Sequence, residues 1–264
     1  METLIDFQTC LSEFSGKFDE LTGRYDHTVQ HSSELEALID DYSTFITDKE
    51  NERIWEQLDH QESGSMHQLV LDLRDKSARC VAVMEKYRAL KLQDGDVEIA
   101  DYFRNIEECI EKEFGSFHVT SDSKVLLVGS GSFPMTPLFI AKRTEAEVVG
   151  IDIDAEAITL GQKVVEKLGA GLNIHLEQTL VQDLAFTRKA THIIFSSTVA
   201  NKYDLLDQLH VLTNEHVVVA MRYGNQLKSL FNYPMRETDS SKWKMVDNIL
   251  RPDDVFDIAL YQKA

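Results

Sequence analysis

Hydrophobic residues follow a helical period through the first part of the chain. Up to about residue 118, Leu, Ile, Phe and Met recur at steps of three and four positions, and glycine is scarce. This spacing predicts amphipathic helices and an all-α N-terminal domain over residues 1–118. The expected helices, separated by breaks at Gly23, Thr47, Gly64 and Gly95, are Leu4–Leu21, Ser33–Phe45, Glu50–His60, Met66–Leu92 and Val97–Phe114.

The pattern changes around residues 115–123, after which short apolar runs alternate with amphipathic segments. Such alternation is typical of a parallel sheet with helices on both faces. We therefore predict a second domain, residues 119–264, of the doubly wound, Rossmann-like α/β class. Its expected strands are 125–128, 148–152, 172–177, 191–196 and 215–221.

The last two apolar segments break this alternation. Lys242–Leu250 and Val255–Tyr261 are joined only by residues 251–254, which is too short for a helical crossover. They should therefore form an antiparallel pair at the edge of the sheet. Parallel strands that end in such a pair are the plan of the S-adenosylmethionine (SAM) dependent methyltransferase fold.

The stretch Lys124–Lys142 is predicted to hold a nucleoside cofactor. An apolar run without alternation, Val125–Val128, leads into Gly129 and Gly131, where missing side chains would let backbone N–H groups approach a ligand. A second apolar run ends in Asp152, where such folds place a carboxylate against ribose hydroxyls. The alternative is a tight turn in an ordinary α/β domain.

The balance of charge narrows the possible partners. Lys and Arg total 27, whereas Asp and Glu total 45, which gives a formal net charge of -18. This charge would repel nucleic-acid phosphates and anionic membrane surfaces, so we expect neither as a partner.

Other features of composition concern compartment and metal. No apolar run reaches the roughly twenty residues that a membrane span needs, and the N-terminus shows no basic region, so we expect a cytoplasmic protein. Cys10, Cys80 and Cys109 are widely spaced and are expected as reduced thiols. The nine histidines are scattered, so no metal site is predicted.

The glycine turn departs from most methyltransferases of this fold. They carry an acid two residues before the first glycine and a third glycine four residues after it, whereas this chain has Leu127 and Phe133 at those places. The missing acid usually helps to hold the methionine end of SAM. That end should therefore be held differently in this protein.

At these residues the chain resembles the nicotianamine synthase family, whose turn reads similarly to GSGSFPMT at 129–136. GIDID at 150–154, MRYG at 221–224 and LFNYP at 230–234 strengthen the resemblance. The helical domain shares it loosely, chiefly through ADYFRNIE at 100–107. The chain is most similar to the bacterial branch, the histidine 2-aminobutanoyltransferases that make staphylopine-type metallophores.

The resemblance implies transfer of the 2-aminobutanoyl (3-amino-3-carboxypropyl) group of SAM to the amine of histidine, with D-histidine favoured, and release of methylthioadenosine. SAM is then a co-substrate, and no metal is required. The product would be a nicotianamine-like metallophore, and a functional link to an opine-type dehydrogenase is implied. The alternatives are a SAM-dependent N-methyltransferase on a small amine and a noncatalytic nucleoside-binding adaptor.

Glu85 is the expected base for the acceptor amine. On the predicted Met66–Leu92 helix it shares a stripe with small alanine side chains, which leave open space around its carboxylate. A partly desolvated carboxylate accepts an amine proton more readily. The resemblance supports this role, because the catalytic glutamate of the family lies in the corresponding helix. The alternative is a structural salt bridge with Arg74 or Arg88.

Further substrate contacts come from tyrosines and one arginine. Tyr102 in the ADYF segment is expected to orient the reacting chain or relay a proton, and Tyr87 is a weaker candidate. For both, a core aromatic with a wet hydroxyl is the alternative. Arg222 stands at the carboxyl end of a predicted strand, where it would clamp a substrate carboxylate unless it forms a structural ion pair. Tyr233 is expected to line the same substrate site as Arg222.

The nucleoside is assigned to the glycine turn and to the ends of the neighbouring strands. Asp152 is expected on the ribose and Gln182 with Asp183 on adenine, whereas Asp154 can cap the following helix. The predicted cofactor contacts are Gly129, Ser130, Gly131, Phe133, Pro134, Asp152, Ile153, Gln182, Asp183 and Ser196.

Overall fold

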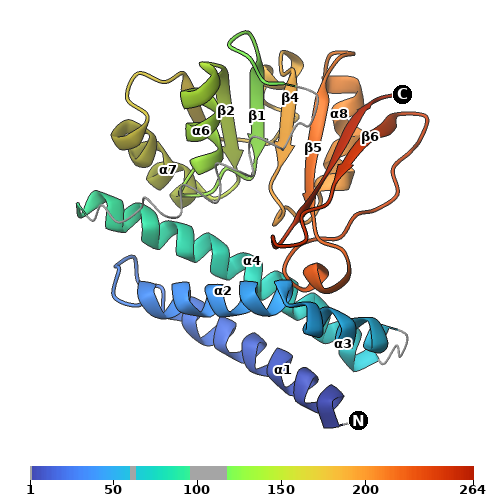
Figure 1. Ribbon diagram of the computed structural model, residues 1–264. Helices are drawn as coiled ribbons and strands as arrows, with labels where there is room; N and C mark the ends of the chain where they lie inside the picture. Colours follow the sequence, from blue (N-terminus) through green and yellow to red (C-terminus); the bar gives the residue numbers. More distant parts are fainter. Residues whose placement is uncertain (1, 60–63, 96–117) are drawn as a thin grey trace. The chain divides into compact units, whose positions relative to one another are not determined.

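The structure, a computed structural model, describes residues 2–59, 64–95 and 118–264 (Figure 1). The chain divides into two compact units. The helical unit comprises residues 1–87, 223–235 and 251–257, and the sheet unit comprises residues 88–222, 236–250 and 258–264. The predicted domain boundary after residue 118 adjoins the range 96–117, which lies outside the described residues, and it stays a prediction.

Helices dominate the first part of the chain, as the hydrophobic spacing predicts. The helices are α1 (Glu2–Gly23), α2 (Ser32–Thr47), α3 (Lys49–Asp59) and α4 (Gly64–Gln93). The predicted helix Val97–Phe114 lies outside the described residues. The helical unit also holds a short 3-10 helix, η2 (Gln226–Leu230), which follows the fifth strand in sequence.

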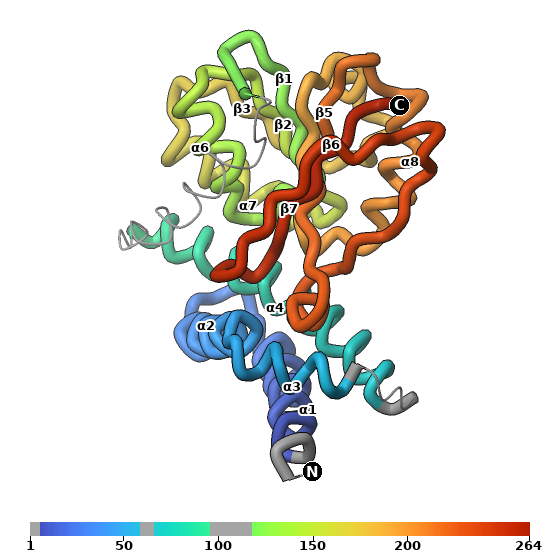
Figure 2. Tube along the Cα trace, turned by 45° about the vertical axis from the view of Figure 1, so that its right-hand side comes forward, coloured from blue at the N-terminus to red at the C-terminus, as the bar shows by residue number. Residues whose placement is uncertain are grey.

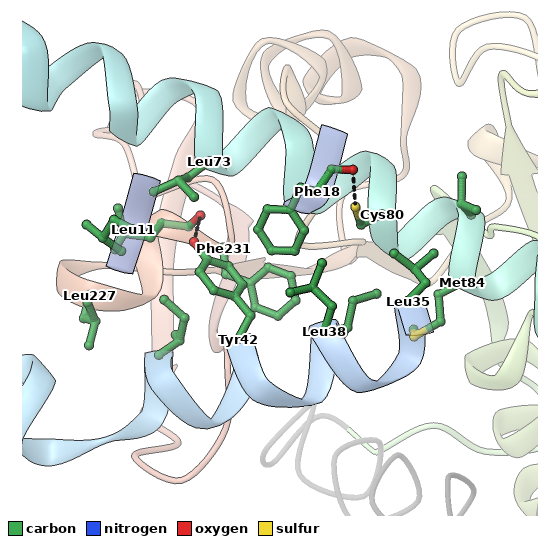
Figure 3. Packing of buried hydrophobic residues seen from close by; sticks show 14 of the residues in the cluster. Leu11, Phe18, Leu35, Leu38, Tyr42, Leu73, Cys80, Met84, Leu227 and Phe231 are labelled. Carbon is green, nitrogen blue, oxygen red and sulfur yellow. Dashed lines mark hydrogen bonds between the residues drawn. The ribbon is translucent and has the colours of Figure 1, made fainter. Parts of the chain in front are cut away.

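An aromatic and aliphatic core holds the helical unit together. Phe18 from α1, Tyr42 from α2 and Leu73 from α4 are fully buried, and Phe231, next to η2, packs in the same cluster (Figure 3). The Tyr42 ring meets Phe18 and Phe231 edge to face, with centroids 4.9 and 5.3 Å apart. The Tyr42 hydroxyl donates to the Leu230 carbonyl at 2.9 Å. Segment 223–235 is therefore tied to the helices by apolar burial and by a buried hydrogen bond.

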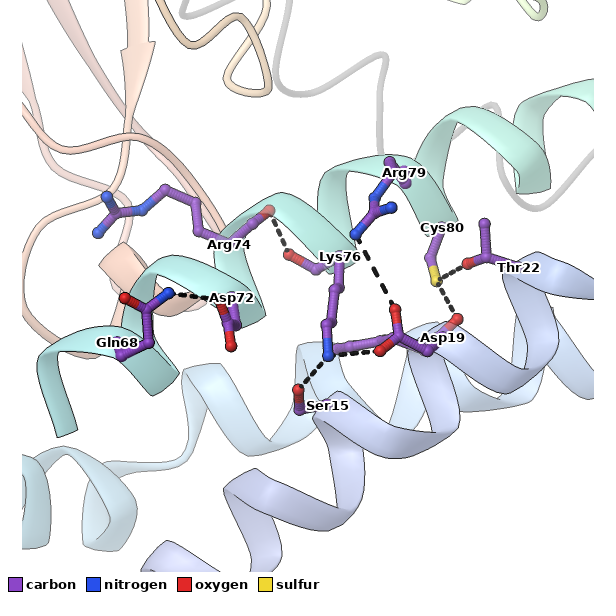
Figure 4. Close-up of polar contacts among 11 residues, drawn as sticks. Ser15, Asp19, Thr22, Gln68, Asp72, Arg74, Lys76, Arg79 and Cys80 are labelled. Carbon is purple, nitrogen blue, oxygen red and sulfur yellow. Dashed lines mark hydrogen bonds and ion pairs between the residues drawn. The ribbon is translucent and has the colours of Figure 1, made fainter. Parts of the chain in front are cut away.

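Polar contacts join α4 to α1 beside this core. Lys76 Nζ donates to Ser15 Oγ at 2.9 Å and pairs with the Asp19 carboxylate at 2.5 Å (Figure 4). The Thr22 hydroxyl and the Cys80 thiol lie 2.8 Å apart. Burial raises the pKa of the Cys80 thiol to about 11, so this free cysteine stays protonated near neutral pH.

Short apolar strands and helices alternate in the rest of the chain. The strands are β1 (Lys124–Val128), β2 (Glu147–Asp152), β3 (Ile174–Gln178), β4 (His192–Phe195), β5 (Val218–Tyr223), β6 (Trp243–Ile249) and β7 (Asp257–Lys263). The helices between them are α6 (Met135–Thr144), α7 (Ala155–Leu168), α8 (Lys202–Leu212) and the 3-10 helix η1 (Ala185–Arg188).

Within the described residues these strands form a seven-stranded sheet of order β3-β2-β1-β4-β5-β7-β6. The neighbouring pairs from β3 to β5 are parallel. β6 and β7 run antiparallel, with an irregularity between Met245 and Asp247, and Figure 2 shows them side by side. The predicted doubly wound sheet and its antiparallel final pair are therefore confirmed.

β3 and β5 begin two and three residues later than the sequence predicts, and a turn explains each of these two differences. β3 begins at Ile174 and not at residue 172, because Leu172 N donates to the Gly169 carbonyl and Gly171 has a φ of 86°. β5 begins at Val218 and not at residue 215, because Asn214 Oδ1 accepts from His216 N at 2.9 Å. A side-chain turn of this kind diverts the backbone from the sheet.

The strand order reverses direction between β1 and β4, since successive strands lie outward on either side of this pair. In doubly wound sheets, ligands bind beyond the carboxyl ends of the strands at this reversal. The glycine turn after β1 and Ser196 after β4 both lie at this place.

In the described part of the chain, no helix is both long enough and apolar enough to cross a bilayer.

Candidate functional site

The turn after β1 needs both of its glycines. Gly129 and Gly131 have φ values of 82° and 66°, in the left-handed region that residues with a Cβ rarely adopt. A Cβ at Gly129 would also stand 2.8 Å from Val199 Cγ2 and 3.1 Å from Ser196 Cβ. The sequence between β1 and α6 therefore combines a special backbone conformation with close approach to the end of β4.

Three backbone N–H groups of this turn, those of Gly129, Ser130 and Gly131, are bonded within the protein, and the predicted contact of the turn with the cofactor stays a prediction. Gly129 N and Ser130 N donate to the Ile151 carbonyl at 2.9 and 3.0 Å. Gly131 N donates to Asp152 Oδ2 at 3.0 Å. These bonds fasten the turn to the end of β2. These three N–H groups are therefore not available to the pyrophosphate of a dinucleotide.

Asp152 is held at the end of β2 by bonds from both sides. Oδ2 accepts from Gly131 N and Oδ1 accepts from Asp154 N, each at 3.0 Å. A carboxylate offers about four lone-pair sites, so this partly buried group can accept further bonds from hydroxyls. Asp154 caps α7, because its side chain accepts from Glu156 N and Ala157 N, as the sequence allowed.

The other predicted nucleoside contacts differ widely in exposure. Ile153 is 76% exposed, directly after Asp152, and presents an apolar surface of the kind on which a planar base can rest. Gln182 and Asp183 are also exposed. Phe133 is buried with Pro134, which stands at the entrance of α6 as predicted.

Ser130 turns toward the sheet. Its Cβ would stand 2.8 Å from a Cβ at Gly150 in β2, and its buried Oγ has no hydrogen-bond partner among the described residues. Leu127, at the place where most methyltransferases of this fold carry an acid, is buried in β1 between Gly150 of β2 and Ile194 of β4. This position therefore contributes to the core of the sheet unit.

A second group of polar residues gathers at the carboxyl ends of β4 and β5. Arg222 Nη2 donates to Thr136 Oγ1 at 3.1 Å, and Ser196 Oγ lies 3.1 Å from Thr198 Oγ1. Lys202, the first residue of α8, donates from Nζ to the carbonyls of Ser197 and Arg222. Sequence reasoning missed Thr136 and Lys202. For Lys202, the available signal was its place at the N-terminus of a helix, where the helix dipole disfavours a lysine.

Glu85 lies on α4, within the helical unit, and is partly buried. The core face of α4 is formed by buried residues that recur at helical spacing, namely Leu73, Cys80, Met84 and Tyr87. Glu85 therefore lies beside this face and not in the apolar core. Its role as base, which depends on its substrate contacts, stays a prediction.

The two predicted tyrosines of this region have different outcomes. Tyr102 lies outside the described residues, so its role stays a prediction. Tyr87 is fully buried in the helical core, where its ring meets Tyr25 edge to face at 5.3 Å. Burial raises its pKa, and its hydroxyl has no hydrogen-bond partner among the described residues. This position favours the core role that the sequence left open.

Tyr233 is held in place by two side chains of α4 within the helical unit. Its hydroxyl donates to Asp75 Oδ1 at 2.7 Å, and the Arg74 guanidinium lies over its ring at 5.5 Å from the centroid. Arg74 Nε also donates to the Ser229 carbonyl at 2.8 Å. Burial and then the bond to Asp75 raise the pKa of Tyr233 to about 12, so the phenol remains a hydrogen-bond donor at neutral pH.

Among the described residues, no group of three or more His, Cys, Asp and Glu side chains is arranged to hold a metal ion. The features that gather at the ends of β1 and β2 are a glycine turn, the fixed carboxylate of Asp152 and the exposed apolar side chain of Ile153. Together with the strand order, they define a nucleoside-binding protein of the methyltransferase class.

The comparison with family models supports this class. Residues 119–258 match the model described as a methyltransferase domain. This match covers more than half of the chain, and the chain therefore belongs to the methyltransferase-domain family.

Curated relatives carry a more particular name. The chain is 28% identical to the L-histidine 2-aminobutanoyltransferase of Pseudomonas aeruginosa over 201 residues, which cover 76% of each protein. It is 28% identical to the L-histidine 2-aminobutanoyltransferase of Yersinia pestis over 238 residues, which cover 89% of this chain and 88% of the relative.

Solved structures extend the likeness to nearly the whole chain. MtNAS, a nicotianamine synthase, in complex with MTA and tNA has a TM-score of 0.79 at 14% identity, over 98% of both chains. A glutamate-to-glutamine mutant of MtNAS in complex with S-adenosylmethionine has a TM-score of 0.71 over 95% of this chain. At this identity the likeness concerns the fold. With the curated relatives, it confirms the resemblance to the nicotianamine synthase family and its histidine 2-aminobutanoyltransferase branch.

Proposed function

We propose that this protein transfers the 2-aminobutanoyl group of SAM to the amine of histidine and releases methylthioadenosine. The observation that carries the proposal is the similarity to proteins named L-histidine 2-aminobutanoyltransferase over 76–89% of the chain. The shared fold with MtNAS, over the helices as well as the sheet, supports it. Because the named relatives specify the L form, L-histidine is the acceptor proposed, in place of the D form favoured from the sequence.

The side chains after β1 and β2 fit SAM as the co-substrate. SAM carries no phosphate, which agrees with a glycine turn whose Gly129, Ser130 and Gly131 N–H groups are engaged by β2. Asp152, whose carboxylate is held by the N–H groups of Gly131 and Asp154, is proposed to accept from the ribose hydroxyls, and the exposed Ile153 is proposed to support the base. Gln182 and Asp183 remain the proposed contacts of the adenine edge.

When bound, SAM supplies a methylene carbon that its sulfonium activates. The histidine amine forms a bond to this carbon while the carbon–sulfur bond breaks, and the bonding electrons stay with the sulfur of methylthioadenosine. The proton of the amine goes to the proposed base, Glu85, with Tyr102 as the proposed relay. Arg222 and Tyr233 are proposed to hold the amino-acid substrate, the first by a charge-assisted bond to a carboxylate.

The buried Leu127 supports a different hold on the methionine end of SAM. An acid at this position would be available to an ammonium group, whereas Leu127 offers only apolar contact inside β1. We infer that the aminobutanoyl chain is held so that its methylene carbon, and not the methyl group, is presented to the acceptor. The position of each activated carbon of SAM relative to the attacking amine decides which carbon reacts.

The proposal extends to the product and its setting. A histidine amine that carries an aminobutanoyl arm has carboxylates, amines and an imidazole, which together chelate transition metals. We propose a staphylopine-type metallophore pathway in the cytoplasm, with an opine-type dehydrogenase as the enzyme that uses the product.

A second candidate function is N-methylation of a small amine, which the match to the methyltransferase-domain family favours. The nucleoside by-product distinguishes the two reactions. The purified protein is incubated with SAM and L-histidine, with D-histidine in a parallel reaction, and the nucleosides are identified by mass spectrometry. Methylthioadenosine supports the proposal and S-adenosylhomocysteine supports the methyltransferase. Unchanged SAM with both enantiomers contradicts the proposed transfer to histidine.

A further inference from the structure

Lys202 is a fully buried lysine in the sheet unit, with no exposed surface. It is the first residue of α8, so its ammonium lies at the positive end of that helix. A charge that is both desolvated and opposed by a helix dipole is unfavourable for folding unless strong acceptors compensate for it. Such local conflicts are expected mainly where function requires them.

The acceptors are backbone carbonyls at the ends of two neighbouring parallel strands. Lys202 Nζ donates to the Ser197 carbonyl, two residues after the end of β4, at 3.1 Å. It also donates to the Arg222 carbonyl in β5 at 2.6 Å. A single ammonium therefore joins the carboxyl ends of β4 and β5, where ligands bind in this architecture.

Arg222 is fixed at two points by these contacts. Its carbonyl accepts from Lys202, and its Nη2 donates to Thr136 Oγ1 in the first turn of α6 at 3.1 Å. The backbone of Arg222 and the far end of its side chain are thus tied to two different helices. An arginine held at its backbone and at its guanidinium keeps the direction of the guanidinium when a carboxylate binds. Less side-chain ordering is therefore needed on binding.

We propose that Lys202 is a positioning residue: by bonding the Ser197 and Arg222 carbonyls it holds the Arg222 guanidinium in the orientation that receives the carboxylate of the amino-acid substrate. This inference rests on the proposed function, because Arg222 is the proposed carboxylate contact of that reaction. Lys202 itself does not touch the substrate.

The test compares Lys202→Met with Lys263→Met. Lys263 is the control, because its side chain is only 5% exposed and its Nζ also donates to a carbonyl, that of Thr213, at 2.7 Å. Its ammonium also lies 3.4 Å from the exposed carboxylate of Glu215. Thr213 follows the other end of α8, away from Lys202. Both variants remove a buried ammonium from a carbonyl, but only Lys202→Met does so beside Arg222.

Lys202→Met should raise the KM for histidine about tenfold with a smaller change in kcat, while the Kd for SAM stays within about twofold of the wild type. Lys263→Met should change none of these. Lys202→Arg, which keeps a charged donor, should retain more histidine affinity than Lys202→Met. It also provides the comparison if Lys202→Met does not fold. Equal histidine KM values in Lys202→Met and Lys263→Met would overturn the proposal. Equal histidine KM values in the wild type, Lys202→Arg and Lys202→Met would also overturn it.

Amide hydrogen exchange tests the positioning without any catalytic activity. Peptides that cover 196–199 and 221–223 should exchange faster in Lys202→Met than in Lys263→Met, because two carbonyls lose their donor. Unchanged exchange there contradicts the proposal even if the wild type is inactive toward histidine. Failure of the proposed function appears separately, as a wild-type protein that makes no methylthioadenosine.

Discussion

Glu85 is the residue on which turnover should depend most. Glu85→Gln removes the proposed proton acceptor but keeps the size and polarity of the side chain. We expect turnover to fall about 10²- to 10⁴-fold while the affinity for SAM is retained. The rate of methylthioadenosine release and the SAM Kd by calorimetry are the measurements.

Glu56→Gln on α3 is the control, since Glu56 is an exposed glutamate of the same helical unit. Its activity should equal that of the wild type. Normal turnover in Glu85→Gln would remove Glu85 from the mechanism.

Single residues differ in how far the sequence reveals them. Asp154 was predictable as a cap because its partners, Glu156 and Ala157, are neighbours in the chain. The partner of Tyr233 is Asp75, which is 158 positions away, and that of Arg222 is Thr136, which is 86 positions away. No local pattern encodes such pairs, because the fold alone brings their atoms together.

The turn between β1 and α6 is the element with the strictest backbone requirement. In Gly129→Ala, a methyl group meets Val199 Cγ2 at 2.8 Å in addition to the unfavourable φ of 82°. We expect a loss of SAM affinity of about tenfold or more, because a displaced turn also moves the end of β2 to which it is bonded. Isothermal titration with SAM measures this loss.

Gly171→Ala is the matched control for that variant. Gly171 has a similar φ of 86°, but a Cβ there meets no atom within 4 Å. It should cost about 1–2 kcal/mol of unfolding free energy from backbone strain and leave the SAM affinity unchanged. Equal SAM affinities in the two variants would show that the turn does not shape the binding site.

The segment after β5 depends on a buried hydrogen bond for its attachment to the helices. Tyr42→Phe leaves the Leu230 carbonyl without its donor and should lower the free energy of unfolding by about 1–3 kcal/mol. Tyr87→Phe is the comparison, since that buried hydroxyl has no partner among the described residues, and its stability should be nearly unchanged. Urea unfolding curves give both values. A larger loss for Tyr87→Phe than for Tyr42→Phe would contradict these assignments.

Element boundaries were predictable where hydrophobic spacing alone decides them. The helical periods of α1 to α4 and the apolar runs of β1 and β2 are local signals, so the predicted positions hold to within a few residues. The starts of β3 and β5 were placed too early, because apolar or neutral residues there are taken up by turns at Gly171 and Asn214. Turn chemistry overrides the strand pattern at these two places.

At the scale of the whole molecule, alternating apolar runs were sufficient to predict the doubly wound sheet and its antiparallel end. The division of the chain into two compact units was harder to predict from the sequence. Residues 223–235 and 251–257 follow or precede strands in sequence, yet they cluster with the helices. The cause lies in their side chains: Leu227, Leu230 and Phe231 are buried in the helical core, and Val255 packs against it. Burial against a distant element is not visible in a local pattern.

The central claim is that the aminobutanoyl chain of SAM, and not its methyl group, is transferred to histidine. The most direct measurement uses SAM labelled with carbon-13 in the aminobutanoyl chain and with deuterium in the methyl group, followed by mass spectrometry of the histidine product. The prediction is a product that carries the carbon-13 label and no deuterium, with the deuterium in methylthioadenosine. A histidine product that carries the deuterated methyl group would contradict the claim.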